Sequence, residues 1–126
     1  MDLTMERIPV GSVQLEVNVQ GSGEAVAFIH GAGPADSFLP LAIEPVLRDH
    51  YRVIRYRRRG YAGSTPADGL VPVTQHAADC RALLDSLHIA KAHVVGHSYG
   101  GCIALQLAAD APELVSTSAL HQSKSQ

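Results

Sequence analysis

The feature that most constrains this chain is a Gly-x-Ser-x-Gly pattern between an apolar stretch and a helical one. Residues 93–95 (His-Val-Val) lead into Gly-His-Ser-Tyr-Gly at 96–100, and residues 101–111 then have helical spacing. A glycine on each side of the serine allows the sharp strand-to-helix turn that projects a hydroxyl from the edge of a sheet. The pattern predicts Ser98 as a candidate nucleophile. The other interpretation, a helix N-cap, is less favoured because a cap needs no flanking glycines.

Apolar stretches alternate with helical patterns through most of the chain. Strands are expected at 8–10, 13–20, 25–29, 51–56 and 91–96, and helices within 37–49, 74–88 and 99–111. The first two strands are expected to form a hairpin with one solvent-exposed face, because apolar and polar residues alternate over 13–20. The later three strands are apolar enough to be buried on both faces. The order predicts the α/β class, with a mostly parallel sheet and flanking helices.

Particular residues refine these helices. Thr74 is expected to cap the second helix, and Pro45 is expected to shorten or kink the first. Cys80 and Cys102 are expected to face the core as small residues of a reduced protein, with no metal-ligand spacing.

Composition excludes several classes of function. The chain has 126 residues, 46% of them hydrophobic, and a net charge of −2, which predicts one domain and gives no global basis for nucleic-acid or membrane binding. An arginine-rich run at 55–59 does not change this expectation, because it ends an expected buried strand and the sequence has no second basic patch. No nucleotide-binding glycine loop, secretion signal or membrane-spanning run is present, so we expect a cytoplasmic protein that has no cofactor.

The C-terminal residues do not fit the pattern of the preceding ones. Residues 1–115 read as the α/β domain, whereas residues 116–126 are mostly polar where another buried strand is expected, and they predict a disordered tail. The fold is therefore expected to be incomplete at its C-terminus, as in a truncated or frame-shifted protein or a fragment. Its exposed sheet edge would favour self-association.

Three motifs carry a family resemblance. His-Gly-Ala-Gly at 30–33, Arg-Gly-Tyr-Ala-Gly-Ser at 59–64 and Gly-His-Ser-Tyr-Gly-Gly at 96–101 each follow an expected strand. In this order they resemble the N-terminal half of an α/β-hydrolase fold protein over residues 6–115. The resemblance implies that Ser98 is the nucleophile acting on a small-molecule substrate. It also implies an oxyanion hole formed by the backbone N–H groups of Ala32 and Tyr99.

The resemblance also implies supporting residues around this site. They are His30, Gly31, Gly33, Arg59, Gly96 and Gly100. Arg57 stands where the family usually has an aspartate, which puts a local acid–base contact in doubt. His97 is expected to line the pocket or pack under the sheet, because adjacent residues at the turn point apart. Gly101 and Cys102 are expected on the packed side of the helix.

A complete catalytic triad is missing from the sequence. After Ser98 the chain offers only Asp110, Glu113 and His121, the first two at the far end of a helix and the last in the polar tail. The parent protein is expected to hydrolyse an ester or similar acyl bond, with weak or no activity in this chain. Alternatives are carbon–carbon bond or lactone hydrolysis, a non-catalytic small-molecule binding module, and an inert fragment.

Overall fold

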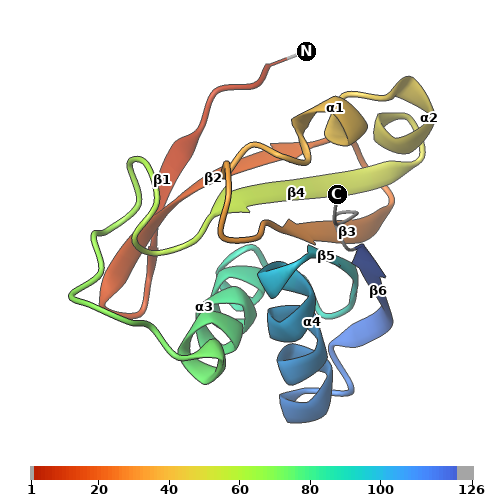
Figure 1. Cartoon of the computed structure of the whole chain (residues 1–126). Helices are drawn as coiled ribbons and strands as arrows, with labels where there is room; N and C mark the ends of the chain where they lie inside the picture. Colours follow the sequence, from red (N-terminus) through yellow and green to blue (C-terminus); the bar gives the residue numbers. More distant parts are fainter. Residues whose placement is uncertain (1, 122–126) are drawn as a thin grey trace, which may run out of the picture.

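A six-stranded sheet with helices on both faces organises residues 2–121, which are the residues that the computed structural model describes (Figure 1). The strands are β1 (Glu6–Val10), β2 (Val13–Gln20), β3 (Glu24–Ile29), β4 (Tyr51–Arg57), β5 (Ala92–His97) and β6 (Val115–His121). The helices are α1 (Leu39–Ala42), α2 (Pro45–Arg48), α3 (Val73–Ser86) and α4 (Tyr99–Asp110).

The sheet has the order β1-β2-β4-β3-β5-β6. The β1–β2 and β2–β4 pairs are antiparallel, whereas β4–β3, β3–β5 and β5–β6 are parallel. The prediction of an α/β fold with an antiparallel edge and a mostly parallel centre is therefore confirmed.

Alternating residues of β3 divide the core between the two faces of the sheet. Ala27 and Ile29 belong to the larger apolar cluster, which α3 and α4 cover. Phe28 faces the other side, where its ring stacks on that of Phe38 at 4.7 Å between centroids, beneath α1. Burial of a large side chain such as Ile29 or Phe28 contributes about 1.5–3 kcal/mol, so the central strand is fixed from both sides.

Of the two predictions about helix ends, the one for Pro45 is confirmed and the one for Thr74 is not. The expected first helix is divided into α1 and α2, with Pro45 at the start of α2, because a proline lacks the N–H that an uninterrupted helix needs. The prediction that Thr74 caps α3 is wrong. The cap position is Pro72, with φ −66° and ψ 155° and no side-chain capping bond, so Thr74 already lies in the first turn.

The expected disordered tail is also wrong for residues 116–121. These residues belong to β6, which pairs in parallel with β5 from Val115 opposite Ala92 to His121 opposite His97. Residues 116–120 are all exposed, and the sequence of the strand shows no apolar pattern. Backbone pairing with β5 holds the strand, together with a 2.7 Å contact between His93 Nδ1 and Thr117 Oγ1. The part of the predicted tail at 122–126 lies outside the described residues.

The two cysteines occupy different environments. Cys80 is buried, as predicted, but Cys102 is exposed, so its predicted core-facing position is wrong. Ile103, Ala104 and Leu107 form the buried stripe of α4. Cys102 lies just outside that stripe, because successive helix residues are about 100° apart.

The β6 assignment predicts alternating amide protection. An edge strand bonds to its neighbour on one side only, so every second amide of residues 116–121 should exchange slowly with solvent. Amides of β5, which has a strand on each side, should be protected throughout. Residue-resolved hydrogen exchange by NMR measures both, and uniformly fast exchange over 116–121 would contradict the strand.

Candidate functional site

Ser98 occupies a strained turn between β5 and α4. Its backbone has φ 56° and ψ −118°, a region that residues with a side chain rarely adopt. Such a conformation costs about 1–3 kcal/mol and persists only where the surroundings enforce it. The side chain is exposed and makes no capping hydrogen bond to α4. Ser98 therefore occupies the N-cap position of α4 but does not cap the helix with its side chain.

Backbone contacts around two glycines enforce this turn. A Cβ at Gly96 would collide with the carbonyl oxygen of Gly100, and one at Gly100 would collide with the carbonyl oxygen of Ile29. The start of α4 therefore packs directly on the ends of β5 and β3. Only glycine fits at either position.

The loop after β3 lies beside Ser98. The parallel register places Ile29 opposite Gly96, so the residues that follow each strand emerge together. A Cβ at Gly31 would lie 3.2 Å from the Ser98 Cβ and 2.8 Å from the His97 carbonyl oxygen. The structure thus brings the 30–33 loop and the serine turn together, and Ala32 and Gly33 are both exposed at this edge.

Arg58, which the sequence analysis did not single out, holds the 30–33 loop from the β4 side. Its side chain is 2% exposed, and its Nε donates to the His30 carbonyl at 3.1 Å and its Nη2 to the Gly31 carbonyl at 2.9 Å. Its Nη1 lies 2.9 Å from His76 Nε2. The guanidinium also lies 4.7 Å from the ring centre of Tyr61 and 5.3 Å from that of Tyr99. The run of arginines gave no signal that two of them, Arg55 and Arg58, are buried.

His30 is hydrogen-bonded through both ring nitrogens. Its Nε2 accepts the backbone N–H of Arg58 at 3.0 Å, which assigns the proton to Nδ1, 2.8 Å from the Gly31 carbonyl. Burial, helped by the charge of Arg58, lowers the pKa of His30 to about 4, and the same causes lower the pKa of His76 to about 4. Both imidazoles are neutral at pH 7, so both remain hydrogen-bond acceptors.

The other arginines of the run are paired with carboxylates. Arg59 binds Asp79 of α3 through two hydrogen bonds of 2.7 and 2.9 Å, which ties its own loop to that helix. Arg57 binds Asp36 at 3.0 Å and Glu16 at 2.8 Å, and its hydrogen bonds lower the pKa of both carboxyls. Arg57, which stands where the resemblance leads one to expect an aspartate, thus has acidic partners of its own.

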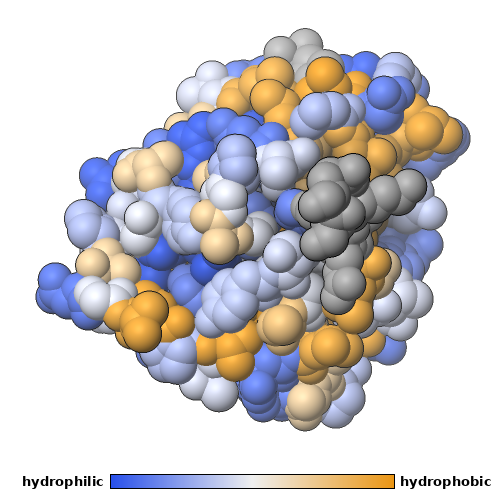
Figure 2. Space-filling view, in the orientation of Figure 1, coloured by the Kyte–Doolittle hydropathy of each residue, from blue (hydrophilic) through white to orange (hydrophobic). Residues whose placement is uncertain are grey.

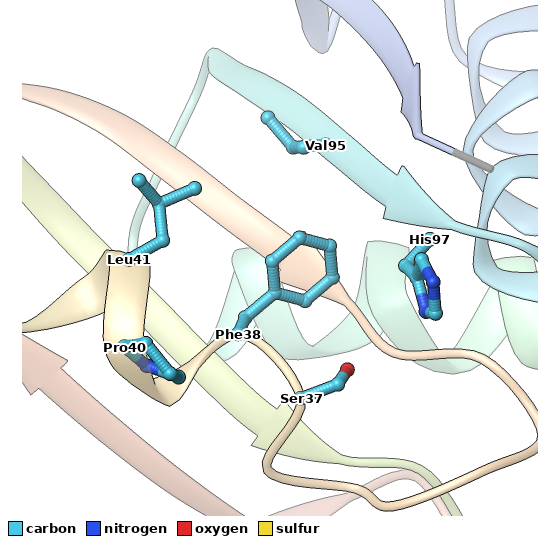
Figure 3. A pocket seen from close by; sticks show the side chains of 6 residues that line it. All are labelled: Ser37, Phe38, Pro40, Leu41, Val95 and His97. Carbon is cyan, nitrogen blue, oxygen red and sulfur yellow. The ribbon is translucent and has the colours of Figure 1, made fainter. Parts of the chain in front are cut away.

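An apolar hollow of about 330 Å³ lies on the face of the sheet that α1 covers (Figure 3). Its lining comprises Ser37, Phe38, Pro40, Leu41, Val95 and His97. The His97 ring is 6.1 Å from that of Phe38, edge-on, so His97 lies on this face, as expected for a pocket-lining residue. Figure 2 shows apolar surface around α1 and α2, where Leu41 is 47% and Val46 is 71% exposed.

The structure does not bring the acidic candidates to Ser98. Asp110 is the last residue of α4, about 18 Å along the helix from its start. Glu113 pairs with Arg81 at 3.6 Å. His121 ends β6 with its backbone opposite His97, so the expectation that no strand places it is wrong; its side chain is not among those described.

Residues 2–121 contain neither a metal-binding cluster of side chains nor a membrane-spanning helix. No group of three or more histidine, cysteine or acidic side chains in this part of the chain is arranged to hold a metal ion. None of its helices combines the length and the apolar character needed to span a bilayer.

Comparison with known proteins identifies related sequences. A sequence model of the family described as "alpha/beta hydrolase fold" matches residues 24–125. A protein of Mycobacterium tuberculosis named non-heme bromoperoxidase BpoC is 38% identical over 109 residues, which are 86% of this chain and 41% of that protein. A protein of Variovorax paradoxus named carbamate hydrolase RutD is 36% identical over 81% of this chain and 39% of its own length.

Solved structures of hydrolases also match most of this chain. A mutant of the meta-cleavage product hydrolase of Pseudomonas fluorescens superposes with a TM-score of 0.81 at 28% identity, over 90% of this chain and 43% of that one. A hydrolase from Pseudomonas aeruginosa gives a TM-score of 0.84 at 26% identity, over 92% and 44%. The chain therefore spans about two fifths of the length of the proteins it matches.

Close backbone packing predicts a selective effect of alanine at the glycines. Gly100→Ala should lower the free energy of unfolding by at least about 2 kcal/mol, because its Cβ meets a backbone carbonyl that cannot move aside. Gly33→Ala, where no atom lies within 4 Å, should change it by less than about 0.5 kcal/mol. Urea unfolding of both variants measures this, and equal effects would contradict the packing.

The buried histidines predict a loss of stability in weak acid. Their pKa is about 4 in the fold against about 6.5 in the unfolded chain, so the unfolded state binds protons first as the pH falls. The free energy of unfolding should be constant above pH 7. It should then decrease from pH 6.5 towards 5 by up to about 1.4 kcal/mol per pH unit for each histidine.

A variant assigns this slope to the histidines. His76→Gln keeps an acceptor for Arg58 but removes one titrating group, so it should halve the slope between pH 6.5 and 5. Urea unfolding at a series of pH values measures it. An unchanged slope in His76→Gln would show that other groups cause the dependence.

Proposed function

The chain belongs to the α/β-hydrolase fold family, and from this membership we propose that Ser98 is the nucleophile of a hydrolase acting on ester or related acyl bonds. The observation that carries the proposal is the strained φ of 56° at an exposed serine, enforced by glycine contacts on both sides. Backbone strain of this kind lowers stability and must be offset by contacts elsewhere in the fold. It is therefore found mostly at functional sites, where the strained conformation is needed.

In the proposed reaction, the Ser98 hydroxyl attacks an acyl carbon and the carbonyl oxygen becomes negatively charged. The backbone N–H groups of Ala32 and Tyr99 are the proposed donors to that oxygen. Two observations support this assignment. Gly31, the residue before Ala32, lies against the Ser98 side chain, and Tyr99 directly follows Ser98 as the first residue of α4. A donor of this kind contributes about 2.7–4 kcal/mol to catalysis by stabilising developing charge.

Proton transfer is the incomplete part of the proposed site. A serine needs a base to accept its proton and a third group to orient that base. Asp110 and Glu113 lie at the far end of α4. We therefore expect weak or no turnover from this chain by itself. A slow reaction with an activated acyl or phosphonyl group can still proceed, because solvent water accepts the serine proton, the activated leaving group departs and the N–H donors stabilise the developing charge.

The related structures favour two further bond types as second candidates. The meta-cleavage product hydrolase is 28% identical, and an enzyme described as degrading N-acyl homoserine lactones is 26% identical with a TM-score of 0.82. Carbon–carbon bond and lactone hydrolysis are therefore proposed alternatives on the same serine. A non-catalytic binding module is the alternative of a different class.

A covalent probe tests the role of the serine. A fluorophosphonate followed by intact-mass measurement should give one adduct per chain, absent from Ser98→Ala and retained in Ser86→Ala, an exposed serine at the end of α3. Peptide mapping should place the adduct on Ser98. Complete absence of an adduct would favour the binding module or inert fragment, and an adduct that survives Ser98→Ala would refute the nucleophile.

A further inference from the structure

We propose that Arg58 is a positioning residue that turns the backbone N–H of Ala32 towards Ser98 by holding the carbonyl of Gly31. The inference rests on the proposed function for its catalytic meaning, because it concerns one of the two proposed oxyanion donors. The arrangement itself is independent of that function and can be measured separately.

Arg58 and Tyr61 contact three consecutive carbonyls of the loop. The guanidinium donates to the carbonyls of His30 and Gly31, at 3.1 and 2.9 Å. Its Nη2 is also 3.3 Å from the Tyr61 hydroxyl, which makes a long 3.5 Å contact with the carbonyl of Ala32. All three carbonyls therefore face the Arg58 side of the loop.

The Gly31 carbonyl is held most firmly of the three. Besides the Arg58 Nη2 donor, it lies 2.8 Å from Nδ1 of His30, which carries the proton because Nε2 accepts the Arg58 backbone N–H. Two donors on one carbonyl oxygen use both of its lone pairs, so rotation of this peptide unit breaks two hydrogen bonds at once.

The geometry of the peptide bond means that fixing the Gly31 carbonyl also fixes the direction of the Ala32 N–H. The Gly31–Ala32 bond is trans, as are all the peptide bonds described, so its C=O and N–H point in opposite directions. With the carbonyl directed at Arg58, the Ala32 N–H is directed away from it. Gly31, which contributes the carbonyl of that peptide, packs on the Ser98 side chain. A Cβ added at Gly31 would lie 3.2 Å from the Ser98 Cβ.

An arginine at position 58 suits the proposed role of positioning the 30–33 loop. Among residues 2–121, Arg58 is buried without a carboxylate partner, whereas Arg55, Arg57 and Arg59 each have one. A buried cation is stabilised here by carbonyls, a neutral imidazole and two aromatic rings. Arginine supplies several donors in a fixed planar fork, which lysine cannot reproduce.

The test measures the direction of the Ala32 N–H bond by NMR. Residual dipolar couplings are measured on the ¹⁵N-labelled chain, and the couplings of the sheet amides determine the molecular alignment. The N–H coupling of Ala32 is then compared between the wild type and each variant. In Arg58→Met the Ala32 coupling should depart from the wild-type value while the couplings of β3, β4 and β5 still fit one alignment. Arg58→Lys, which keeps the charge, should show the same departure and remains informative if Arg58→Met does not fold.

Two controls separate positioning from general stability. Leu83→Ala creates a cavity under α3 and should lower the melting temperature without changing the Ala32 coupling. Arg81→Met removes an exposed arginine paired with Glu113 and should change neither. An Ala32 coupling that is unchanged in both Arg58 variants, or equally changed in Leu83→Ala, would overturn the proposal.

Fluorophosphonate labelling then connects the orientation to reactivity. If wild-type Ser98 is labelled, Arg58→Met and Arg58→Lys should react about 100-fold more slowly, the effect of losing one oxyanion donor. A changed Ala32 coupling with unchanged labelling would overturn the catalytic part of the inference. If the wild type is not labelled at all, the proposed function fails, while the couplings still decide whether Arg58 sets the loop.

Discussion

The close approach of three backbone segments at the ends of β3 and β5 is the constraint on which the site depends. Side chains are excluded at Gly31, Gly96 and Gly100, because a neighbouring backbone or the Ser98 side chain already occupies the space. The positive φ of Ser98 follows from this packing and is not a local preference of serine. The strain of about 1–3 kcal/mol is sustained because β3 and β5 are fixed in a sheet packed on both faces.

Charge is arranged differently from what the sequence of the loop suggested. The run at 55–59 carries four arginines, yet Asp36, Glu16 and Asp79 neutralise three of them. Arg57 does not leave a missing acid–base contact where the family usually has aspartate. The acids come from β2 and from the loop after β3. Three of the four arginines are therefore ion-paired, and the fourth, Arg58, is buried.

Strong local patterns made the central sheet and the serine turn predictable. The run from Ala25 to Ile29 in β3 is continuously apolar, as is typical of a strand buried on both faces, and the serine turn requires glycines at fixed positions. β6 was missed because an edge strand with exposed side chains needs only its backbone to pair, so its Ser-Thr-Ser sequence carries no signal. Arg58 was missed for another reason: its partners in the 30–31 loop and His76 are distant in sequence and consist mostly of backbone carbonyls.

The two requirements of serine catalysis therefore separate within this chain. Under the proposed roles, charge stabilisation depends on Ala32, Tyr99 and Arg58, all within segments packed against one another. Proton transfer depends on a base and an acid, and the acidic residues Asp110 and Glu113 lie at the far end of α4. In serine hydrolases that lose their triad, the oxyanion hole and binding still give about 10³–10⁴-fold acceleration over water. A preformed hole without a base would thus keep a measurable fraction of the chemistry, provided that the Gly31–Ala32 peptide stays in its orientation.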